Sequence, residues 1–192
     1  MENKKIDVRS RYTQGIIKQA YLELLEENDE HNVTVAAICK RAQINRGTFY
    51  NHFIDILDVQ KTIENELFEE IANTLNSNKA NSLNLDFYLS AIKIISDNKI
   101  LFTSVFKNIQ GNMFFKNLID YSKNKYVRDF KEAYPNVSEC DIDTMFAYVL
   151  HGSIGILAEW FSKNETIDSD KVAKEICYYN DIIIQSFLKS KK

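Results

Sequence analysis

The sequence contains only 5 glycines and 1 proline among its 192 residues, where average usage would give about 13 and about 10. Hairpins, tight turns and βαβ crossovers use more of both residues, because glycine and proline supply the backbone conformations that turns need. Long helices need neither. The scarcity of both residues therefore predicts an all-α protein.

Composition and targeting features narrow the class of protein further. With 45% hydrophobic and 27% charged residues, the chain resembles an ordinary soluble globular protein. Apolar runs such as Phe146 to Leu150 are far shorter than the ~20 residues of a membrane span, and the start, MENKKIDVRSRY, lacks the apolar core of a signal peptide. The cysteines at 39, 140 and 177 form no CxxC pair, which argues against zinc sites and disulfide frameworks. We therefore expect a cytoplasmic protein that needs no metal or cofactor.

Apolar residues recur at helical spacing along most of the chain. The first stripe, Ile16, Ala20 and Leu24, follows Ser10 as a candidate N-cap and ends in an acidic stretch at Glu30. Further helices are expected over 35–42, 46–53, 55–75, 85–97, 99–109, 113–134, 139–163 and 169–189, with a polar linker at 76–84. The pattern predicts a three-helix domain over 1–54, and a connecting helix with a larger helical body over 55–192.

The segment from Thr34 to Phe53 has the anatomy of a helix-turn-helix. Thr34 and Asn45 are suited to cap its two helices, and Phe49 and Phe53 share the face that would be buried. The side chains that project away from this face are small, hydroxyl, amide and guanidinium groups, which are the kinds that contact base edges and phosphates. They belong to Arg46, Gly47, Thr48, Tyr50 and Asn51.

Charge is segregated along this part of the chain, although the net charge is only -3. Residues 23–30 carry five acids and no base, whereas residues 31–54 carry Lys40, Arg41 and Arg46 and no acid. Such a distribution can present a basic face to nucleic acid if the acidic stretch points away.

The residues from Arg11 through Ile16 and Ala20, followed by VTVAAICKRAQINRGTFYNHF at 33–53, closely resemble the DNA-binding domain of the TetR family of transcription regulators. Its characteristic tail is matched by Thr48, Phe49, Tyr50, His52 and Phe53. The region 97–106 and HGSIGILAEWF at 151–161 are similar to the C-terminal domain of the subgroup that includes regulators of dihydroxyacetone kinase operons. The resemblance thus covers most of the chain.

The resemblance implies a set of DNA-contacting residues, with phosphate contacts from Tyr50 and His52. The full set is Arg11, Thr34, Lys40, Arg46, Gly47, Thr48, Tyr50, Asn51 and His52, and Arg41 is a further basic candidate. The family usually has a lysine three residues after the Phe53 position, where this chain has Ile56. Loss of that phosphate contact is expected to reduce the dependence of DNA binding on salt. The slope of log K against log salt concentration should become smaller by about one unit.

The resemblance also implies a homodimer with an effector pocket in the body. For the pocket we expect walls of Phe102, Phe106, Tyr121, Phe146, Tyr148, His151 and Trp160. For the dimer interface we expect Val149, Gly152, Leu157, Val172, Ile176, Ile183 and Phe187. A small molecule in the pocket would favour a different spacing of the two recognition helices and so release the operator DNA.

The implied function is a one-component transcription regulator, with repression as the usual output and activation as an open alternative. The competing interpretation is a coregulator that binds a protein partner or ligand and does not itself bind DNA. Ile56 and the acidic pI of about 5.7 favour it. Enzymatic interpretations have no support, because GxSxG, Walker A and GxGxxG motifs are absent and no glutamate stands three residues before a histidine.

Overall fold

The computed structural model describes residues 8–27, 33–77, 85–107, 112–162 and 168–190. Within these ranges every regular element is a helix, which confirms the predicted all-α class. The nine helices of the described residues are α1 (Val8–Glu27), α2 (Val35–Arg41), α3 (Arg46–Tyr50), α4 (Ile56–Ser77), α5 (Leu85–Asp97), α6 (Lys99–Lys107), α7 (Met113–Ala133), α8 (Glu139–Ser162) and α9 (Ser169–Ser190). They divide into two units, Met1–Leu67 and Phe68–Lys192, and α4 contributes to both.

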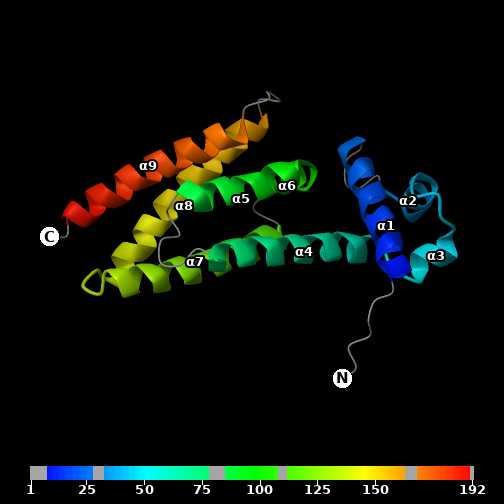
Figure 1. Ribbon diagram of the computed structural model, residues 1–192, viewed down its shortest axis with the longest axis horizontal. Helices are drawn as coiled ribbons and strands as arrows, with labels where there is room; N and C mark the ends of the chain where they lie inside the picture. Colours follow the sequence, from blue (N-terminus) through cyan, green and yellow to red (C-terminus); the bar gives the residue numbers. More distant parts are fainter. Residues whose placement is uncertain (1–7, 28–32, 78–84, 108–111, 163–167, 191–192) are drawn as a thin grey trace, which may run out of the picture. The chain divides into compact units, whose positions relative to one another are not determined.

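The first unit is built around the packing of α2 on α1 and of α3 on α2 (Figure 1). Its interior contains Ile17 and Tyr21 from α1, Ile38 from α2 and Phe49 from α3, each no more than 1% exposed. Burying one such side chain stabilises a fold by about 1.5–3 kcal/mol. These few large side chains therefore hold the short α3 in place without using its remaining surface.

The helix limits differ from the prediction at two places in this unit. Ser10 lies inside α1, which begins at Val8, so it is not the N-cap. The α3 helix ends at Tyr50 rather than Phe53, because Asn51 and His52 form a turn whose N–H groups bond to the carbonyls of Gly47 and Phe49. The expected end of the first helix at Glu30 and most of the predicted linker lie outside the described residues.

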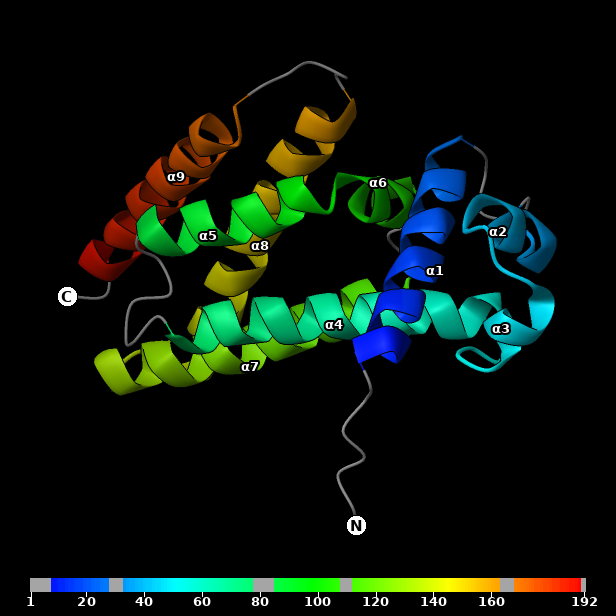
Figure 2. The ribbon, with the colours of Figure 1, turned by 45° about the vertical axis from the view of Figure 1, so that its right-hand side comes forward.

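The second unit packs α9 beside α5, with α8 in contact with both α9 and α7 (Figure 2). One core cluster joins α7, α8 and α9 through side chains such as Tyr126, Phe146 and Ile184. A second joins α5, α8 and α9 through side chains such as Ile92 and Val172. The predicted helices of the body match the observed limits to within one or two residues where both ends are described.

Four residues expected at a dimer interface are buried inside this chain instead. Val149, Leu157, Val172 and Ile176 are 7%, 8%, 2% and 1% exposed, because they pack into the two core clusters. Ile183 and Phe187 are half-buried against the first cluster. Among the residues predicted at the interface, Gly152 is exposed, and a Cβ built on it would meet nothing within 4 Å in this chain.

The described residues contain neither a membrane-spanning helix nor a cluster of metal ligands. None of their helices combines the length and the apolar character that crossing a bilayer requires. They also contain no group of three or more His, Cys, Asp or Glu side chains that could hold a metal ion.

Candidate nucleic-acid interface

The two helices of the helix-turn-helix are capped as the sequence predicts. Thr34 accepts a hydrogen bond through Oγ1 from the backbone N–H of Ala37 at 3.1 Å, and Asn45 accepts one through Oδ1 from that of Thr48 at 2.7 Å. Between them Gln43 has a φ of 54°, the left-handed conformation that commonly ends a helix. The caps and this residue turn the chain sharply between α2 and α3.

The α3 helix is anchored through one aromatic face. Phe49 is fully buried and Phe53 is 3% exposed, with ring centroids 6.1 Å apart. The opposite face is exposed at Arg46, Tyr50 and Asn51. A helix of five residues held by its apolar side alone leaves its polar side chains available to a ligand in a groove.

Gly47 also lies on the exposed face of α3. A Cβ built at this position would meet only Oδ1 of Asn45, at 3.2 Å, among the atoms around it. The glycine therefore leaves the face flat in front of the cap, where another surface can approach the backbone. Thr48 contributes less to this face, because it is half-buried and its Oγ1 donates a hydrogen bond to Asn45 Oδ1 at 3.1 Å.

The basic side chains around α3 fall into two groups. Arg11, Lys40 and Arg46 are exposed and form no ion pair with any described residue. Arg41, by contrast, is bound to Glu23 at 3.1 Å and to Glu27 at 2.6 Å. Arg41 is therefore already paired with two carboxylates of α1, and its contact with DNA stays a prediction.

The hydrogen bonds of this cluster also change the acidity of its carboxyl groups. Hydrogen bonds from Gln19 and Arg41 lower the pKa of Glu23, and the bond from Arg41 lowers the pKa of Glu27. Both glutamates thus stay charged, and they partly cancel the positive charge of the domain on that side.

His52 lies in the turn after α3 and is half-buried. Its Nδ1 lies 3.5 Å from the hydroxyl oxygen of Ser10, at the limit of a hydrogen bond. The ring is therefore held close to the first turns of α1, where Arg11 is exposed. Of the nine predicted DNA-contacting residues, seven are exposed, and Thr48 and His52 are half-buried.

The start of α4 carries acids and exposed apolar side chains. Asp55 Oδ1 accepts from the N–H of Asp58 at 2.8 Å, and Asp58 Oδ2 accepts from the N–H of Ile54 at 2.9 Å, which closes the helix start. Ile56 is half-buried, whereas Ile54 and Leu57 are 80% and 60% exposed. Sequence reasoning missed these two exposed side chains, because an apolar residue at a helix start normally points inward.

Among the cavities described for the resolved ranges of the body, none is lined by the whole set of aromatic residues expected for an effector pocket. Phe102 is 1% exposed and Phe106 is half-buried, and the ring of Phe102 contacts those of Phe106 and Phe114. Tyr148 is 66% exposed and His151 is also exposed. The remaining three lie in different places. The ring of Tyr121 packs against that of Phe68, Trp160 lines a surface groove, and Phe146 lines a cavity.

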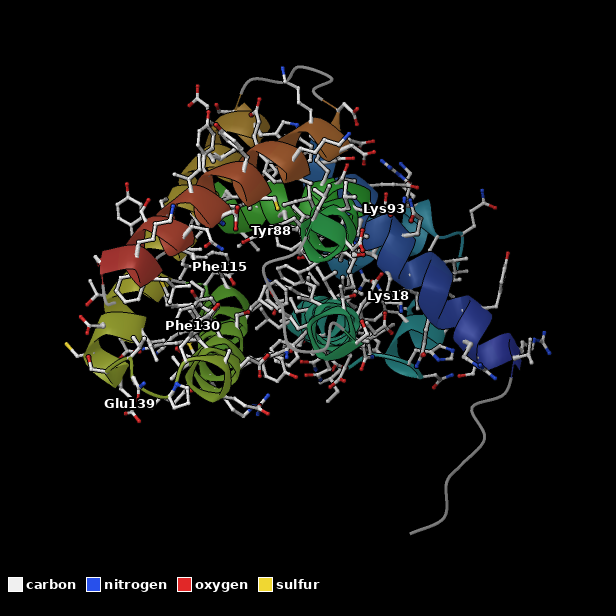
Figure 3. The ribbon with its side chains drawn as sticks, turned by 60° about the vertical axis from the view of Figure 1, so that its left-hand side comes forward. Lys18, Tyr88, Lys93, Phe115, Phe130 and Glu139 are labelled. Atoms are coloured by element: carbon white, nitrogen blue, oxygen red, sulfur yellow. The ribbon has the colours of Figure 1, made fainter. Side chains whose placement is uncertain are left out.

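A cavity of about 170 Å³ does lie in the second unit, among α4, α5, α7, α8 and α9. Its lining includes Tyr88, Ser122, Lys125, Tyr126, Phe146 and Asn180. Tyr88 and Phe130, labelled in Figure 3, belong to α5 and α7, two of the helices around the interior of this unit. The sequence signal for this cavity was weak, since Lys125 and Asn180 have the polar character of surface residues and yet are 8% and 4% exposed.

Two family models match the chain. The one described as "Bacterial regulatory proteins, tetR family" matches residues 16–56, and the one described as "Transcriptional regulator C-terminal region" matches residues 82–181. Among curated proteins, the HTH-type dhaKLM operon transcriptional activator DhaS of Lactococcus lactis subsp. lactis (strain IL1403) is 30% identical over 105 residues. That match covers 51% of this chain and 51% of the relative, so it spans about half of the relative's length.

Solved structures share the fold at low sequence identity. The dihydroxyacetone kinase operon activator DhaS has a TM-score of 0.66 at 22% identity and covers 91% of this chain and 96% of its own. A transcriptional regulator from Aquifex aeolicus VF5 has a TM-score of 0.72 at 18% identity and covers 89% and 99%. At these identities the likeness establishes the arrangement of helices alone.

The helix-turn-helix with an exposed polar face, joined to an all-α body, defines a DNA-binding transcription regulator. The chain belongs to the TetR family of bacterial transcription regulators, as both family models indicate. Members of this family bind DNA, generally act as dimers and are not enzymes.

Proposed function

We propose that this protein binds a palindromic DNA operator as a homodimer and places one α3 helix of each copy in the major groove. The observation that carries the proposal is the division of α3 into a buried face at Phe49 and an exposed face at Arg46, Tyr50 and Asn51. The DNA-binding part would be residues 1–54, and residues 55–192 would form the connecting helix and the body.

Each exposed group on α3 has a matching partner on DNA. The guanidinium of Arg46 suits the O6 and N7 atoms of guanine, and the amide of Asn51 suits the N6 and N7 atoms of adenine. The hydroxyl of Tyr50 and the charges of Arg11 and Lys40 suit phosphates, which fix the position of the helix without reading sequence. Thr34, Gly47, Thr48 and His52 would complete the contact surface.

The homodimer would use an exposed face of α8 and α9 that keeps Gly152 of the predicted interface and leaves out its buried residues. Gly152 and Gly155 lie mid-helix, where glycine costs about 1 kcal/mol against alanine, and a Cβ at either would meet nothing within 4 Å in this chain. Close approach by a helix of a second copy gives these glycines a role. Tyr148 on α8 and Ile182 on α9 are exposed apolar side chains that support the same face.

A dimer of this kind sets the distance between the two α3 helices. Two half-sites one helical turn of DNA apart require about 34–36 Å between the recognition helices. A small molecule that binds the body and favours a different distance would release the operator, provided that its affinity differs between the two states. The cavity among α4, α5, α7, α8 and α9 supports such a site.

For the direction of control we propose repression, the usual output of the family, with a small-molecule effector that relieves it. Activation is a second candidate, favoured by the relative that is 30% identical over 105 residues and is named a transcriptional activator. A coregulator without DNA binding is less well supported, because the exposed basic side chains near α3 (Arg11, Lys40 and Arg46) have no ion-pair partner among the described residues. The proposed setting is the bacterial cytoplasm, where the operator lies.

The deciding experiment is a mobility-shift assay of the full chain on the promoter of its own gene, beside random DNA of equal length. We expect tighter binding to the promoter, and equal binding to both DNAs would contradict an operator. Transcription from that promoter with and without the protein then gives the direction. Increased transcription in the absence of the protein indicates repression, and decreased transcription indicates activation.

A further inference from the structure

The cavity of the second unit has polar groups at one part of an otherwise apolar lining. Asn180, which is 4% exposed, donates from Nδ2 to the hydroxyl oxygen of Tyr88 at 2.9 Å and to that of Ser153 at 3.0 Å. Ser153 in turn donates to the carbonyl of Val149 at 2.8 Å. Because Tyr88 accepts from Asn180, the proton of its own hydroxyl remains to be donated.

Tyr126, a second tyrosine of the lining, has a hydroxyl without a partner among the described residues. Tyr126 is 6% exposed, and its oxygen is buried without a hydrogen bond to any described residue. A buried hydroxyl in that condition is costly, and most such groups in proteins are bonded to protein, water or ligand. Burial also raises the pKa of both tyrosines, that of Tyr88 to about 12, so both hydroxyls are neutral donors at ordinary pH.

The charged side chain that lines the cavity, Lys125, is already paired with a carboxylate. Lys125 Nζ lies 2.5 Å from Asp129 Oδ2, and the two side chains are only 9% and 14% exposed. Arg128 approaches the other oxygen of Asp129 at 3.5 Å from a largely exposed position. A charged ligand would enter without a free counter-charge and would lose its hydration, which is unfavourable in a mostly apolar site.

The cavity is partly open to the surface, and the space inside it suits about one ring. A volume of about 170 Å³ is close to that of the ~150 Å³ engineered cavities that bind benzene. Phe87, Phe146 and Leu150 supply apolar contact surface around it. The space is smaller than the pockets of about 300–1,000 Å³ that drug-sized ligands occupy.

The geometry points to a compact, uncharged ligand of about one ring, with a single hydroxyl or carbonyl oxygen that hydrogen-bonds to the tyrosine hydroxyls of the cavity. Its identity as the effector rests on the function proposed above, whereas its binding does not. Phenol is the simplest probe, toluene lacks the oxygen at nearly the same size, and benzoate adds a charge.

The test is calorimetric titration of the full chain with phenol, toluene and benzoate, each into wild type and Tyr126→Phe. We expect phenol to bind wild type about three- to tenfold more tightly than toluene, the effect of about one hydrogen bond, and benzoate to bind far more weakly than either. In Tyr126→Phe the preference for phenol should fall, while toluene affinity stays the same. Tyr134→Phe, on an exposed tyrosine just after α7, is the matched control and should change neither.

Among the outcomes that would overturn the inference, three come from comparing the probes. They are equal affinity of wild type for phenol and toluene, tighter binding of benzoate, and an unchanged phenol preference in Tyr126→Phe. Leu150→Phe, which narrows the cavity, should weaken phenol and toluene alike, and unchanged binding would show that the ligand sits elsewhere. If a variant fails to fold, the ranking of the three probes on wild type still decides.

The effector role is tested separately. Saturation with phenol should lower the affinity of the full chain for its promoter. Unchanged promoter affinity would contradict release by this ligand and would leave the ligand class intact. Failure of all three probes to bind would overturn the ligand class, and would leave DNA recognition by α3 untouched.

Discussion

Glu27, the last residue of α1, accepts a hydrogen bond at 2.6 Å from the guanidinium of Arg41, the last residue of α2. The second nitrogen of the same guanidinium lies 3.1 Å from Glu23. Arg41 therefore joins two helices of the DNA-binding unit through two ion pairs. Arg46, five residues later, is exposed and forms no ion pair among the described residues.

This contrast predicts different effects of two arginine substitutions on DNA binding. Arg46→Ala should weaken operator binding by about 1–3 kcal/mol and relax the preference at one base position, because it removes a direct base contact. Arg41→Ala should change operator affinity much less. Fluorescence anisotropy at fixed salt measures both, and an equal loss for the two variants would contradict the assignment.

The same cluster predicts a dependence of stability on pH. The pKa values of Glu23 and Glu27 are lowered in the folded protein, so the unfolded chain binds protons first as the pH falls. Their stabilisation is therefore present above about pH 4.3, the ordinary glutamate value, and is lost as the pH falls through the lower folded values. Urea unfolding at several pH values should show this decline.

Arg41→Gln should make that decline smaller, since Arg41 bonds to both glutamates. Arg46→Gln is the control and should leave it unchanged, because Arg46 pairs with no described acid. A decline of the same size in all three proteins would mean that other carboxylates are responsible.

Tyr50 should contribute to DNA affinity without contributing to sequence preference. Its ring is 57% exposed on α3, and a phosphate contact acts on any sequence. Tyr50→Ala is therefore expected to weaken binding to operator and to random DNA by similar factors. Loss of operator binding alone would show that Tyr50 reads a base.

The cap of α3 should be needed for the stability of the first unit. Asn45→Ala removes the acceptor of the Thr48 N–H and is expected to cost about 1 kcal/mol, measured as the free energy of unfolding in urea. Asn51→Ala, at the other end of the same helix, is the matched control, since no side-chain bond of Asn51 holds the described helix. Equal losses would show that the cap is not the cause.

The proposed dimer is tested by a charge at an exposed apolar position. Ile182 is 45% exposed on α9, so Ile182→Glu should leave the folded monomer nearly as stable while it disrupts a buried contact with a second copy. Sedimentation at micromolar concentration should show a dimer for wild type and a monomer for the variant. Leu57→Glu, at a 60% exposed position on α4, is the control and should remain dimeric.

The helices themselves were predictable from the sequence because local rules determine them. Scarce glycine and proline, periodic apolar residues and the caps Thr34 and Asn45 led to the observed elements, and the family tail led to the family. Ser10 failed as a cap because a serine can also lie within the first turns of a helix, and the local pattern does not separate the two positions.

Tertiary features were less predictable, for a physical reason. The stripe of Val172 and Ile176 shows that one face of α9 is apolar, but not whether that face packs within the chain or against a second copy. The pairing of Arg41 with acids of α1 depends on how α2 packs, which charge segregation along the sequence does not report. The aromatic content likewise indicated a crowded interior without locating its cavity.

The hydrogen bonds of Asn180 have a consequence for the alignment of α9 along α5 and α8. An apolar stripe such as Val172 and Ile176 could slip by one helical turn, about 5.4 Å, and still meet apolar neighbours. Asn180 could not, since the same slip would part its amide from both Tyr88 and Ser153 and leave it buried without partners. The single polar side chain of Asn180 thereby selects one alignment of α9 among the several that the apolar contacts alone would allow.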